Sequence, residues 1–416
     1  MAHISYKYKL LPSKRQEKSL SQMAGSTRWL WNYMLDLNQK QYAIDKKFIF
    51  GFNMNLLLPE LKAQHIWLKD PPSQTLQQKC IDLDRALKSV WKSGFGFPKF
   101  KSKHKTKDSF RIPQTNGHIK ISESHIKIPK LGEIKWKYHR SLTGILKSIT
   151  ISRDIDDWVV SVLCEIPDVA LITDVDQSKT IGIDLGVAHF ATLSDGTKID
   201  SPNLLKKKLK YLKKYQRQLS KKTKGSNNRK KAAKRISKIH RYIRNQRSDW
   251  LHKISTTLVQ KYDVICIEDL QIKKLIEKKQ MSRAISDQGW GIFTGLLAQK
   301  ATARGTHVTK IGTYMPSTKT CSACGTIRQM KLSDRVYICE NNRCADYLKT
   351  KDRDWNAAIN IHFWGLTATQ NINLHTPGMG GINACGDTSA QDDDHFIEQH
   401  LGVSMNQEAV CPSGPQ

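Results

Sequence analysis

The chain has 416 residues, with 68 Lys and Arg against 37 Asp and Glu, so its formal net charge is +31. This excess favours a large polyanion as partner, first of all nucleic acid, while 39% hydrophobic residues exclude a wholly disordered chain and suffice for two or three domains. The start lacks the apolar segment of a secretory signal, and no run approaches the roughly eighteen apolar residues of a membrane helix, so we expect a cytoplasmic protein with no membrane contact.

The N-terminal part is predicted to be a strand followed by helices. Residues 4–12 alternate in character and end at Pro12, which is typical of a strand. Ser13 and Gln16 fit a capping box, the pair that marks the first turn of a helix. Apolar residues then recur at helical spacing, so residues 13–95 are expected to be mostly helical.

A β-rich segment follows a Gly- and Lys-rich passage that begins near residue 94. Its strand-like stretches are residues 118–121, 125–129, 133–139, 147–152 and 158–166. One strand precedes the helical block and the others follow it. The simplest arrangement is therefore one β-barrel, formed by residues 1–12 and 96–178, with residues 13–95 inserted into it.

The second half is predicted to be an α/β domain. A strand at residues 181–187 leads into a hairpin whose turn is Asp195-Gly196. Ser201 and Pro202 are expected to cap and begin a helix, and a second helix follows the break at Gly225. A strand at 263–270, a helix near 290–303 and a strand at 306–312 complete the order of an RNase H-like fold. The whole chain is thus expected to be multidomain, α+β followed by α/β.

Three acids lie at comparable places in this second half. Asp184 is in the apolar strand IGIDLGV, Glu268 ends the strand VICIE, and Asp354 opens the helix DWNAAINI. A carboxylate in an apolar strand is costly unless a cation compensates it, and carboxylates are suitable ligands for Mg²⁺ or Mn²⁺. Two such ions can promote phosphodiester hydrolysis. We therefore expect the three acids to form a catalytic metal site, with Asp184 bridging both ions.

Each acid has an ordinary explanation when it is taken alone. Asp184 would be a turn residue, Glu268 a solvated strand edge beside Asp269, and Asp354 a helix N-cap. Asp269 and Asp352 are also nearby competitors for the metal-binding roles. The order of the acids along the predicted elements is what favours a common site.

Four of the nine cysteines are closely grouped, in the segments CSAC and CENNRC: Cys321, Cys324, Cys339 and Cys344. Two such pairs can place four thiolates around one tetrahedral Zn²⁺, whereas disulfides or unpaired core thiols are the alternatives, disulfides being disfavoured in a reducing compartment. Four thiolates leave no open position for water, so the zinc is expected to be structural. The other cysteines are expected to be isolated thiols: Cys80, Cys164, Cys266, Cys385 and Cys411.

Positive charge is concentrated on the two helices predicted after residue 201. Residues 206–247 contain nineteen Lys or Arg and no acid, with Tyr and His interleaved. This pattern favours phosphate contacts and base stacking, although a solvated helix face is the ordinary alternative, and it does not distinguish DNA from RNA. The residues expected to contact nucleic acid are Lys207, Lys210, Lys214, Arg217, Lys221, Arg229, Lys230, Lys234, Arg241 and Arg244.

The chain resembles the TnpB proteins of bacterial insertion sequences in segments that occur in the same order: YKYKLLPSKRQEKSL, WLKDPPSQTLQQKCIDLDRALKSV, GFPKFKSK, IGIDLGV, VICIEDL, TKTCSACG and DRDWNAAINI. The likeness covers about residues 3–365. It implies an RNA-guided DNA endonuclease with a RuvC-type nuclease domain, related to the type V CRISPR effectors. Its guide RNA would derive from a transposon end, and its double-stranded DNA target would be flanked by a short transposon-adjacent motif.

Carried over position by position, the resemblance places the RuvC triad on Asp184, Glu268 and Asp354 and the zinc ligands on the four grouped cysteines. The β-barrel would be the wedge domain, and residues 13–95 the recognition domain, which would hold the guide–target duplex by its shape. The six-residue segment CENNRC is longer than the family's usual knuckle, which leaves its geometry open.

The same resemblance divides the rest of the chain. Residues 179–366 would form the RuvC-like nuclease domain, with a basic helical hairpin at 202–260 and an inserted zinc ribbon at 317–349. Residues 367–416 match little and are expected to be a disordered tail.

Two other functions compete with a nuclease. One is a nucleic-acid-binding regulator of transposition that does not cleave, and the other is a DNA-strand transferase. The presence of all three acids favours the nuclease, for which Mg²⁺ or Mn²⁺, Zn²⁺ and a guide RNA are the expected cofactors. The sequence leaves the guide, the flanking motif and any protein partner open.

Overall fold

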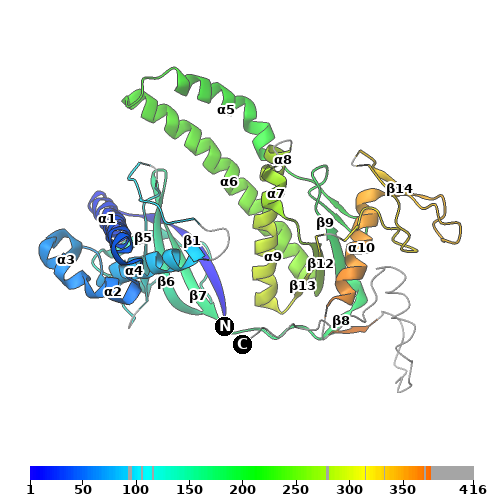
Figure 1. Cartoon of the computed structure of the whole chain (residues 1–416), viewed down its shortest axis with the longest axis horizontal. Coiled ribbons are helices and arrows are strands. Elements are labelled where there is room, and N and C mark those ends of the chain that lie inside the picture. The colour runs from blue at the N-terminus through cyan, green and yellow to red at the C-terminus, as the bar shows by residue number, and fades with distance from the viewer. Residues whose placement is uncertain are drawn as a thin grey trace. The chain divides into compact units, whose positions relative to one another are not determined.

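The computed structural model describes residues 1–91, 96–104, 106–114, 117–277, 281–313, 315–331, 333–369 and 372–375. The chain divides into two compact units, Met1–Asp168 and Val169–Gln416, whose elements are labelled in Figure 1. Both helices and strands occur in each unit, as expected for a mixed α/β protein. The division falls after Asp168, inside the segment 96–178 that the sequence analysis assigns to the barrel.

The first unit contains a seven-stranded antiparallel sheet in the order β2-β6-β7-β1-β5-β4-β3. Its strands are β1 (Ala2–Leu11), β2 (Ser109–Pro113), β3 (Lys120–Ile121), β4 (His125–Ile128), β5 (Gly132–Lys137), β6 (Ile145–Asp154) and β7 (Asp157–Ile166). Strand β2 is not predicted from the sequence, because its two buried apolar residues stand in a Lys-rich passage. Among the described residues no strand pairing joins the outer strands β2 and β3, so closure into a barrel stays a prediction.

Helices fill the gap between β1 and β2 along the chain, as predicted. They are α1 (Lys14–Asp45), α2 (Gly51–Leu56), α3 (Leu58–Gln64) and α4 (Ser73–Lys88), with short 3₁₀ turns at Ile66–Lys69 and Ser89–Trp91. The predicted capping box is present, because Ser13 and Gln16 bond each other's main-chain N–H groups. The first half of α1 packs on the sheet through Leu20 and Met23, and its second half packs against α4 in a separate core.

The second unit is built on a five-stranded sheet in the order β11-β10-β9-β12-β13. Its strands are β9 (Thr180–Asp184), β10 (Ala191–Leu193), β11 (Lys198–Ile199), β12 (Val264–Glu268) and β13 (His307–Ile311). The first three strands are antiparallel, whereas β9, β12 and β13 run parallel. The order of these five strands along the chain is the one that the sequence predicts for this half.

Helices of this unit pack on both faces of the sheet, apart from α5 (Leu204–Ser220), which packs against α6. The others are α6 (Asn227–Lys261), α7 (Ile272–Glu277), α8 (Ser282–Gln288), α9 (Trp290–Arg304) and α10 (Arg353–Thr367). One core joins Ile265 of β12 to α6 and α9, and another joins the next residue, Cys266, to α10. Successive strand residues point to opposite faces, so α10 lies across the sheet from α6 and α9 (Figure 1).

The predicted start of α5 is wrong by two residues. The helix begins at Leu204, and Asn203 precedes it in the left-handed conformation with no side-chain cap. The carboxylate of Asp287, from the distant helix α8, accepts from the backbone N–H of Leu205 at 3.1 Å. Tertiary contact therefore supplies the acceptor that a local Ser201 cap was expected to provide.

The end of the described chain returns to the start of the second unit. Strand β16 (Asn373–His375) pairs in parallel with β8 (Asp174–Asp176), so the expected disordered tail is wrong for these residues, and α10 extends one residue beyond 366. Residues 370–371 and 376–416 of that tail lie outside the described residues. In the part of the chain that the structure describes, no helix has the length and apolar character needed to cross a membrane.

Candidate functional site

Two of the predicted acids end neighbouring parallel strands. Ile183 of β9 pairs with Ile267 of β12, and the next residues, Asp184 and Glu268, are the last of each strand. Parallel neighbours lie about 4.8 Å apart and residues in register project to the same face. Both carboxylates therefore leave the sheet on one face, with Asp184 at the strand's end and not in its middle as predicted.

Helix α10 covers this face at very short range. A Cβ atom at Gly182 of β9 would lie 2.2 Å from the carbonyl oxygen of Ala358, and one at Gly365 of α10 would lie 2.3 Å from the Cβ of Cys266. Gly182 and Cys266 precede the two acids by two residues and so share their face. The helix is thus held against the side of the sheet from which both carboxylates project.

The third acid reaches the same place from the helix. Asp354 is in the first turn of α10, one turn before Ala358, so its side chain projects in the same direction. Its Oδ2 lies 3.9 Å from the Cβ position of Gly186, in the loop after β9. The structure therefore brings Asp184, Glu268 and Asp354 together where the two strands end and α10 begins.

The electrostatics of the site favour a bound cation. Burial, followed by the negative charges of Asp354 and Glu268, raises the pKa of Asp184 to about 8. Burial also raises the pKa of Glu268. Among the described residues, no hydrogen bond or ion pair is found for the side chain of either Asp184 or Glu268. A divalent ion would remove the repulsion among these groups and restore their ionised form.

Arg353 is a site residue that the sequence analysis missed. Its guanidinium donates from Nη2 to Asp354 Oδ1 at 3.1 Å, and its side chain is only 14% exposed. Its positive charge also partly offsets the rise in the pKa of Asp184. The sequence does contain a signal that could have identified Arg353, because this cation directly precedes the candidate metal ligand Asp354.

The two competing acids are engaged elsewhere. Asp352 is the N-cap of α10, where its Oδ1 accepts from the backbone N–H groups of Asp354 and Trp355 at 3.0 Å, and its Oδ2 pairs with Lys198 at 2.7 Å. Asp269 pairs with Lys310 at 2.9 Å. Both acids thus have other polar partners, although the negative charge of Asp352 also contributes to the raised pKa of Asp184.

The grouped cysteines converge more tightly than the carboxylates do. Within the described residues, they are the one group of candidate ligand atoms found to lie within 4.8 Å of one another. Cys321 Sγ is 3.9 Å from Cys344 Sγ, and Cys324 Sγ is 3.6 Å from Cys339 Sγ. Four thiolates at about 2.3 Å from a tetrahedral zinc would lie about 3.8 Å apart. The cluster fits that ion.

The surroundings of the cluster support thiolate ligands. The backbone N–H of Asp346 donates to Cys344 Sγ at 3.3 Å, and Asn341 Nδ2 donates to Cys324 Sγ at 3.6 Å. Gly325 adopts a φ of +74°, which a turn after the first pair requires and which glycine adopts without strain. The hairpin of β14 (Val336–Ile338) and β15 (Thr350–Asp352) joins the cluster to α10.

Two buried asparagines fasten the first cysteine pair to the helix that carries Asp354. Asn356 Oδ1 accepts from the backbone N–H of Ser322 at 3.0 Å, and its Nδ2 donates to Thr320 O at 2.6 Å. Asn360, one turn further along α10, donates to Ser317 O and Thr320 O at 2.8 and 2.7 Å. The sequence analysis did not single out either residue.

The basic helices α5 and α6 pack as a hairpin with little core. Leu212 is the buried residue of α5, and Ile243 is the first buried residue of α6, so the basic portion projects from the sheet domain (Figure 1). Most of the predicted nucleic-acid contacts are exposed. Arg229 differs, because its Nη1 donates to Leu219 O and Lys222 O, both at 2.9 Å, and closes the turn between the helices.

Three tyrosines line a hollow of about 340 Å³ between α5 and α6. Tyr211 and Tyr242 are 55% and 50% exposed, and Lys208 Nζ lies 5.6 Å and 5.4 Å from the centres of their rings. Tyr215 and Lys238 complete the polar and aromatic lining. Exposed rings beside ammonium groups are suited to stacking on bases and contacting phosphates.

Comparison with protein families gives three matches along the chain. They are OrfB_IS605, "Probable transposase", over residues 161–279; "Cas12f1-like, TNB domain" over residues 290–361; and HTH_OrfB_IS605, "Helix-turn-helix domain", over residues 1–47. The first two together span Asp184, Glu268, the cysteine cluster and Asp354. Over residues 1–47 the structure has one strand, β1, and one long helix, α1.

Several curated relatives align with most of the chain. One is "Putative RNA-guided DNA endonuclease InsQ" of Escherichia coli (strain K12), 34% identical over 378 residues, covering 86% of this chain and 91% of the relative. Another is "Putative RNA-guided DNA endonuclease" of Streptomyces pristinaespiralis, 31% identical over 375 residues, with 88% and 90% covered. "TnpB-like protein L79" of Acanthamoeba polyphaga mimivirus is 31% identical over 247 residues, with 56% and 46% covered.

Among solved structures, a Cas12f1–sgRNA–target DNA complex aligns with 87% of this chain and 99% of its own, at 16% identity and a TM-score of 0.31.

Proposed function

The chain belongs to the TnpB family, and from this membership we propose that it is an RNA-guided DNA endonuclease encoded by an insertion sequence. The observation that carries the proposal is the meeting of Asp184, Glu268 and Asp354 at the ends of β9, β12 and the start of α10. In this proposal the second unit is a RuvC-type nuclease domain of RNase H-like fold. The two relatives that match most of the chain bear the name of this activity.

The three carboxylates would hold Mg²⁺ or Mn²⁺. When bound, two such ions supply an acidified water and stabilise the charge that develops on the scissile phosphate. The protein's own part is to hold the carboxylates in place, through the close packing of α10 on Gly182 and Cys266. Arg353 holds one oxygen of Asp354 and limits the directions in which that side chain can turn.

The cysteine cluster would hold one structural zinc. Four thiolates occupy every position of a tetrahedral ion, so no water can be activated there. The contribution of this module to cleavage would be mechanical, because it is fastened to α10 through Asn356 and Asn360. On this proposal the zinc ribbon supports the position of Asp354.

The partners would be a guide RNA derived from a transposon end and a double-stranded DNA next to a short transposon-adjacent motif. The basic hairpin of α5 and α6 would hold a nucleic-acid backbone in a salt-dependent way. The sheet domain and helices of the first unit would act as the wedge and recognition domains. The cytoplasm, where transposon DNA and its transcripts meet, would be the place of action.

The test is cleavage by the protein together with the RNA that copurifies with it. We expect that RNA to extend beyond a transposon end, and the complex with Mg²⁺ to cut DNA that matches the extension. Asp184→Ala should reduce cutting to the background level while RNA binding persists. Asp269→Ala is the matched control, because this neighbouring acid pairs with Lys310 at 2.9 Å.

Three results would contradict this proposal. Undiminished cutting by Asp184→Ala would remove the residue from the catalytic site. Bound RNA without cutting by the wild-type protein, under any divalent ion, would favour the non-cleaving regulator. Covalently joined DNA products would instead indicate a strand transferase.

A further inference from the structure

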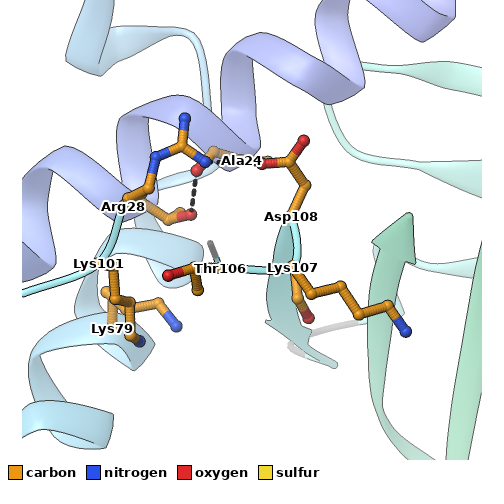
Figure 2. Close-up of a pocket in the computed structure, with 9 residues that line it drawn as sticks. Ala24, Arg28, Lys79, Lys101, Thr106, Lys107 and Asp108 are labelled. Atoms are coloured by element: carbon orange, nitrogen blue, oxygen red, sulfur yellow. Dashed lines mark hydrogen bonds and ion pairs between the residues drawn. The ribbon is translucent and has the colours of Figure 1, made fainter. Parts of the chain in front are cut away.

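A cavity of about 190 Å³ lies within the first unit, whereas the carboxylates and the cysteine cluster belong to the second. It is lined by α1, by α4 and by the loop that leads into β2. Four cationic residues contribute to its lining, together with one acid and several hydroxyl groups (Figure 2): Ala24, Thr27, Arg28, Lys79, Lys101, Thr106, Lys107, Asp108 and Ser109. Neither the nuclease site nor the basic hairpin accounts for this concentration of positive charge.

Two of the four cations have acidic partners. Arg28 Nη1 donates to Asp108 Oδ1 at 2.6 Å, and both side chains are largely buried. Lys79 Nζ pairs with Asp82 Oδ2 at 3.0 Å and is 11% exposed. Lys101 and Lys107 have no ion-pair partner among the described residues. The cavity therefore retains about two positive charges.

Lys101 is held in place more firmly than a surface lysine. The side chain of Asn32 on α1 accepts from the backbone N–H of Lys101 at 2.7 Å and donates to its carbonyl oxygen at 2.9 Å. Its Nζ lies 3.4 Å from the centre of the Trp31 ring. Figure 2 shows Lys79 and Lys101 on the same side of the cavity, whereas Lys107 extends away from them. The loop thus presents one fixed ammonium group beside a second.

That ammonium group is in an unfavourable position, because nearby negative charge compensates it only in part. Burial, and then the positive charge of Lys79, lower the pKa of Lys101 to about 8, and the carboxylate of Asp82, which pairs with Lys79, opposes this shift without cancelling it. An ordinary run of solvated lysines would keep each ammonium group in water, where no such penalty arises. An anion in the cavity would remove the penalty and would accept hydrogen bonds from several donors at once.

We propose that this cavity binds one phosphate group of a nucleic-acid backbone. The cavity has room for a phosphate, and the ammonium groups of Lys79 and Lys101 and the Thr106 hydroxyl are the donors that would surround it. A backbone phosphate carries one negative charge, so it is opposite in sign to the residual charge of the cavity and offsets part of it. That the phosphate belongs to nucleic acid rests on the proposed function, whereas the anion site itself does not.

The first experiment uses inorganic phosphate as the probe and the full RNA-free chain. Tm is measured against phosphate concentration, with sodium chloride keeping the ionic strength constant. Phosphate should raise the Tm of the wild type, because a ligand that binds only the folded state stabilises it, and Lys101→Met should abolish this rise. Methionine retains the apolar stem beside Trp31, so the variant should fold.

Lys103→Met is the matched control for that experiment. Lys103 is exposed, belongs to the same loop and does not line the cavity, so its substitution should leave the phosphate effect intact. A rise of equal size in Lys101→Met would overturn the site. The absence of any rise in the wild type would do the same.

The second experiment identifies the source of the phosphate. Affinity for the copurifying RNA is measured at several salt concentrations. The slope of log K against log salt is negative, and each lost phosphate contact should reduce its magnitude by about 0.7 to 0.9. Lys101→Met should show this loss and Lys103→Met should not. Phosphate binding with an unchanged slope would overturn the nucleic-acid source and indicate a free anion. Failure of DNA cleavage alone would count against the proposed function and leave the phosphate result standing.

Discussion

Asn356 accepts a hydrogen bond from the backbone N–H of Ser322 at 3.0 Å, and this contact joins the two chemical centres of the second unit. Ser322 follows the first cysteine of the cluster, and Asn356 lies two residues after Asp354 on α10. The side chain of Asn356 is fully buried. A change in the cysteine module therefore has a direct route to the helix that carries a predicted metal ligand.

Asn356→Ala should separate the cysteine module from α10. The substitution removes two buried hydrogen bonds and leaves Ser322 N–H and Thr320 O without that partner, so the free energy of unfolding should fall by about 2 to 4 kcal/mol. Urea unfolding measures the change. Asn228→Ala, at an exposed site on α6, should change it by less than about 0.5 kcal/mol. Equal effects of the two substitutions would show that the hydrogen bonds of Asn356 contribute nothing to the free energy of unfolding.

Gly182→Ala should push α10 away from β9. The added methyl group would lie 2.2 Å from the carbonyl oxygen of Ala358, a backbone atom that cannot move aside cheaply, so we expect a loss of about 1 to 3 kcal/mol in stability and a marked fall in cleavage. Gly295→Ala on α9 is the control. Its Cβ would meet nothing within 4 Å, and the helix should gain about 0.5 to 1 kcal/mol. Thermal unfolding of both variants shows whether each substitution lowers or raises the Tm.

The raised pKa of Asp184 gives a pH dependence of defined sign. Its folded-state pKa of about 8 lies above the ordinary value of 3.8, so between these pH values the folded state binds more protons than the unfolded one. The free energy of unfolding should therefore decrease as pH rises through this window. Asp184→Asn, which cannot ionise, should lose that component of the decrease.

The measurement is urea unfolding of both proteins at several pH values without divalent ions. Saturating Mg²⁺ should flatten the Asp184-dependent component in the wild type, because a bound cation keeps the carboxylate ionised in the folded state. Parallel pH profiles for the wild type and Asp184→Asn would contradict the assignment.

The cysteine cluster predicts about one zinc atom per chain. Elemental analysis of the purified protein should find this amount, and Cys339→Ser should lose most of it, because a hydroxyl group is a poor substitute for a thiolate. Cys164→Ala is a suitable control, since Cys164 is a buried free thiol in the sheet of the first unit. Zinc retained in Cys339→Ser at the wild-type level would exclude this residue as a ligand.

The tyrosine hollow on the basic hairpin predicts base stacking. Replacing Tyr211 and Tyr242 together by Ala should weaken binding of single-stranded RNA by about 1 to 3 kcal/mol for each base that stacks, with little change in the salt dependence. Fluorescence anisotropy with a labelled oligonucleotide measures both quantities. Tyr347→Ala, at a half-exposed ring in the cysteine module, is the control. If the double substitution changes the salt dependence of RNA binding but not the affinity, the two rings only position nearby lysines.

Local patterns were sufficient to predict much of the second unit. The alternation around Ile183 and the turn at Asp195-Gly196 indicate the hairpin, and apolar character indicates β12. The glycine at position 225, with a φ of +87°, marks the break between the basic helices as predicted. These features depend on residues close in the sequence, where periodicity and turn chemistry act directly.

Other features depend on partners that are distant in the sequence. The start of α5 is set by Asp287 on α8, and the roles of Arg353 and Asn356 follow from what their side chains contact. The close packing at Gly182 and Gly365 likewise requires two elements to be placed together. A linear pattern identifies the candidate acids, but it contains neither the face of the sheet that they share nor the helix that closes over it.

The pairing of β8 with β16 has a consequence for the two ends of the second unit. Asn373 Nδ2 donates to Asp174 Oδ1 across a separation of 199 residues. The strands β8 and β16, near the two ends of the described part of the second unit, therefore lie side by side. A substitution at either of these two strands therefore acts directly on the other, although they lie far apart in the sequence.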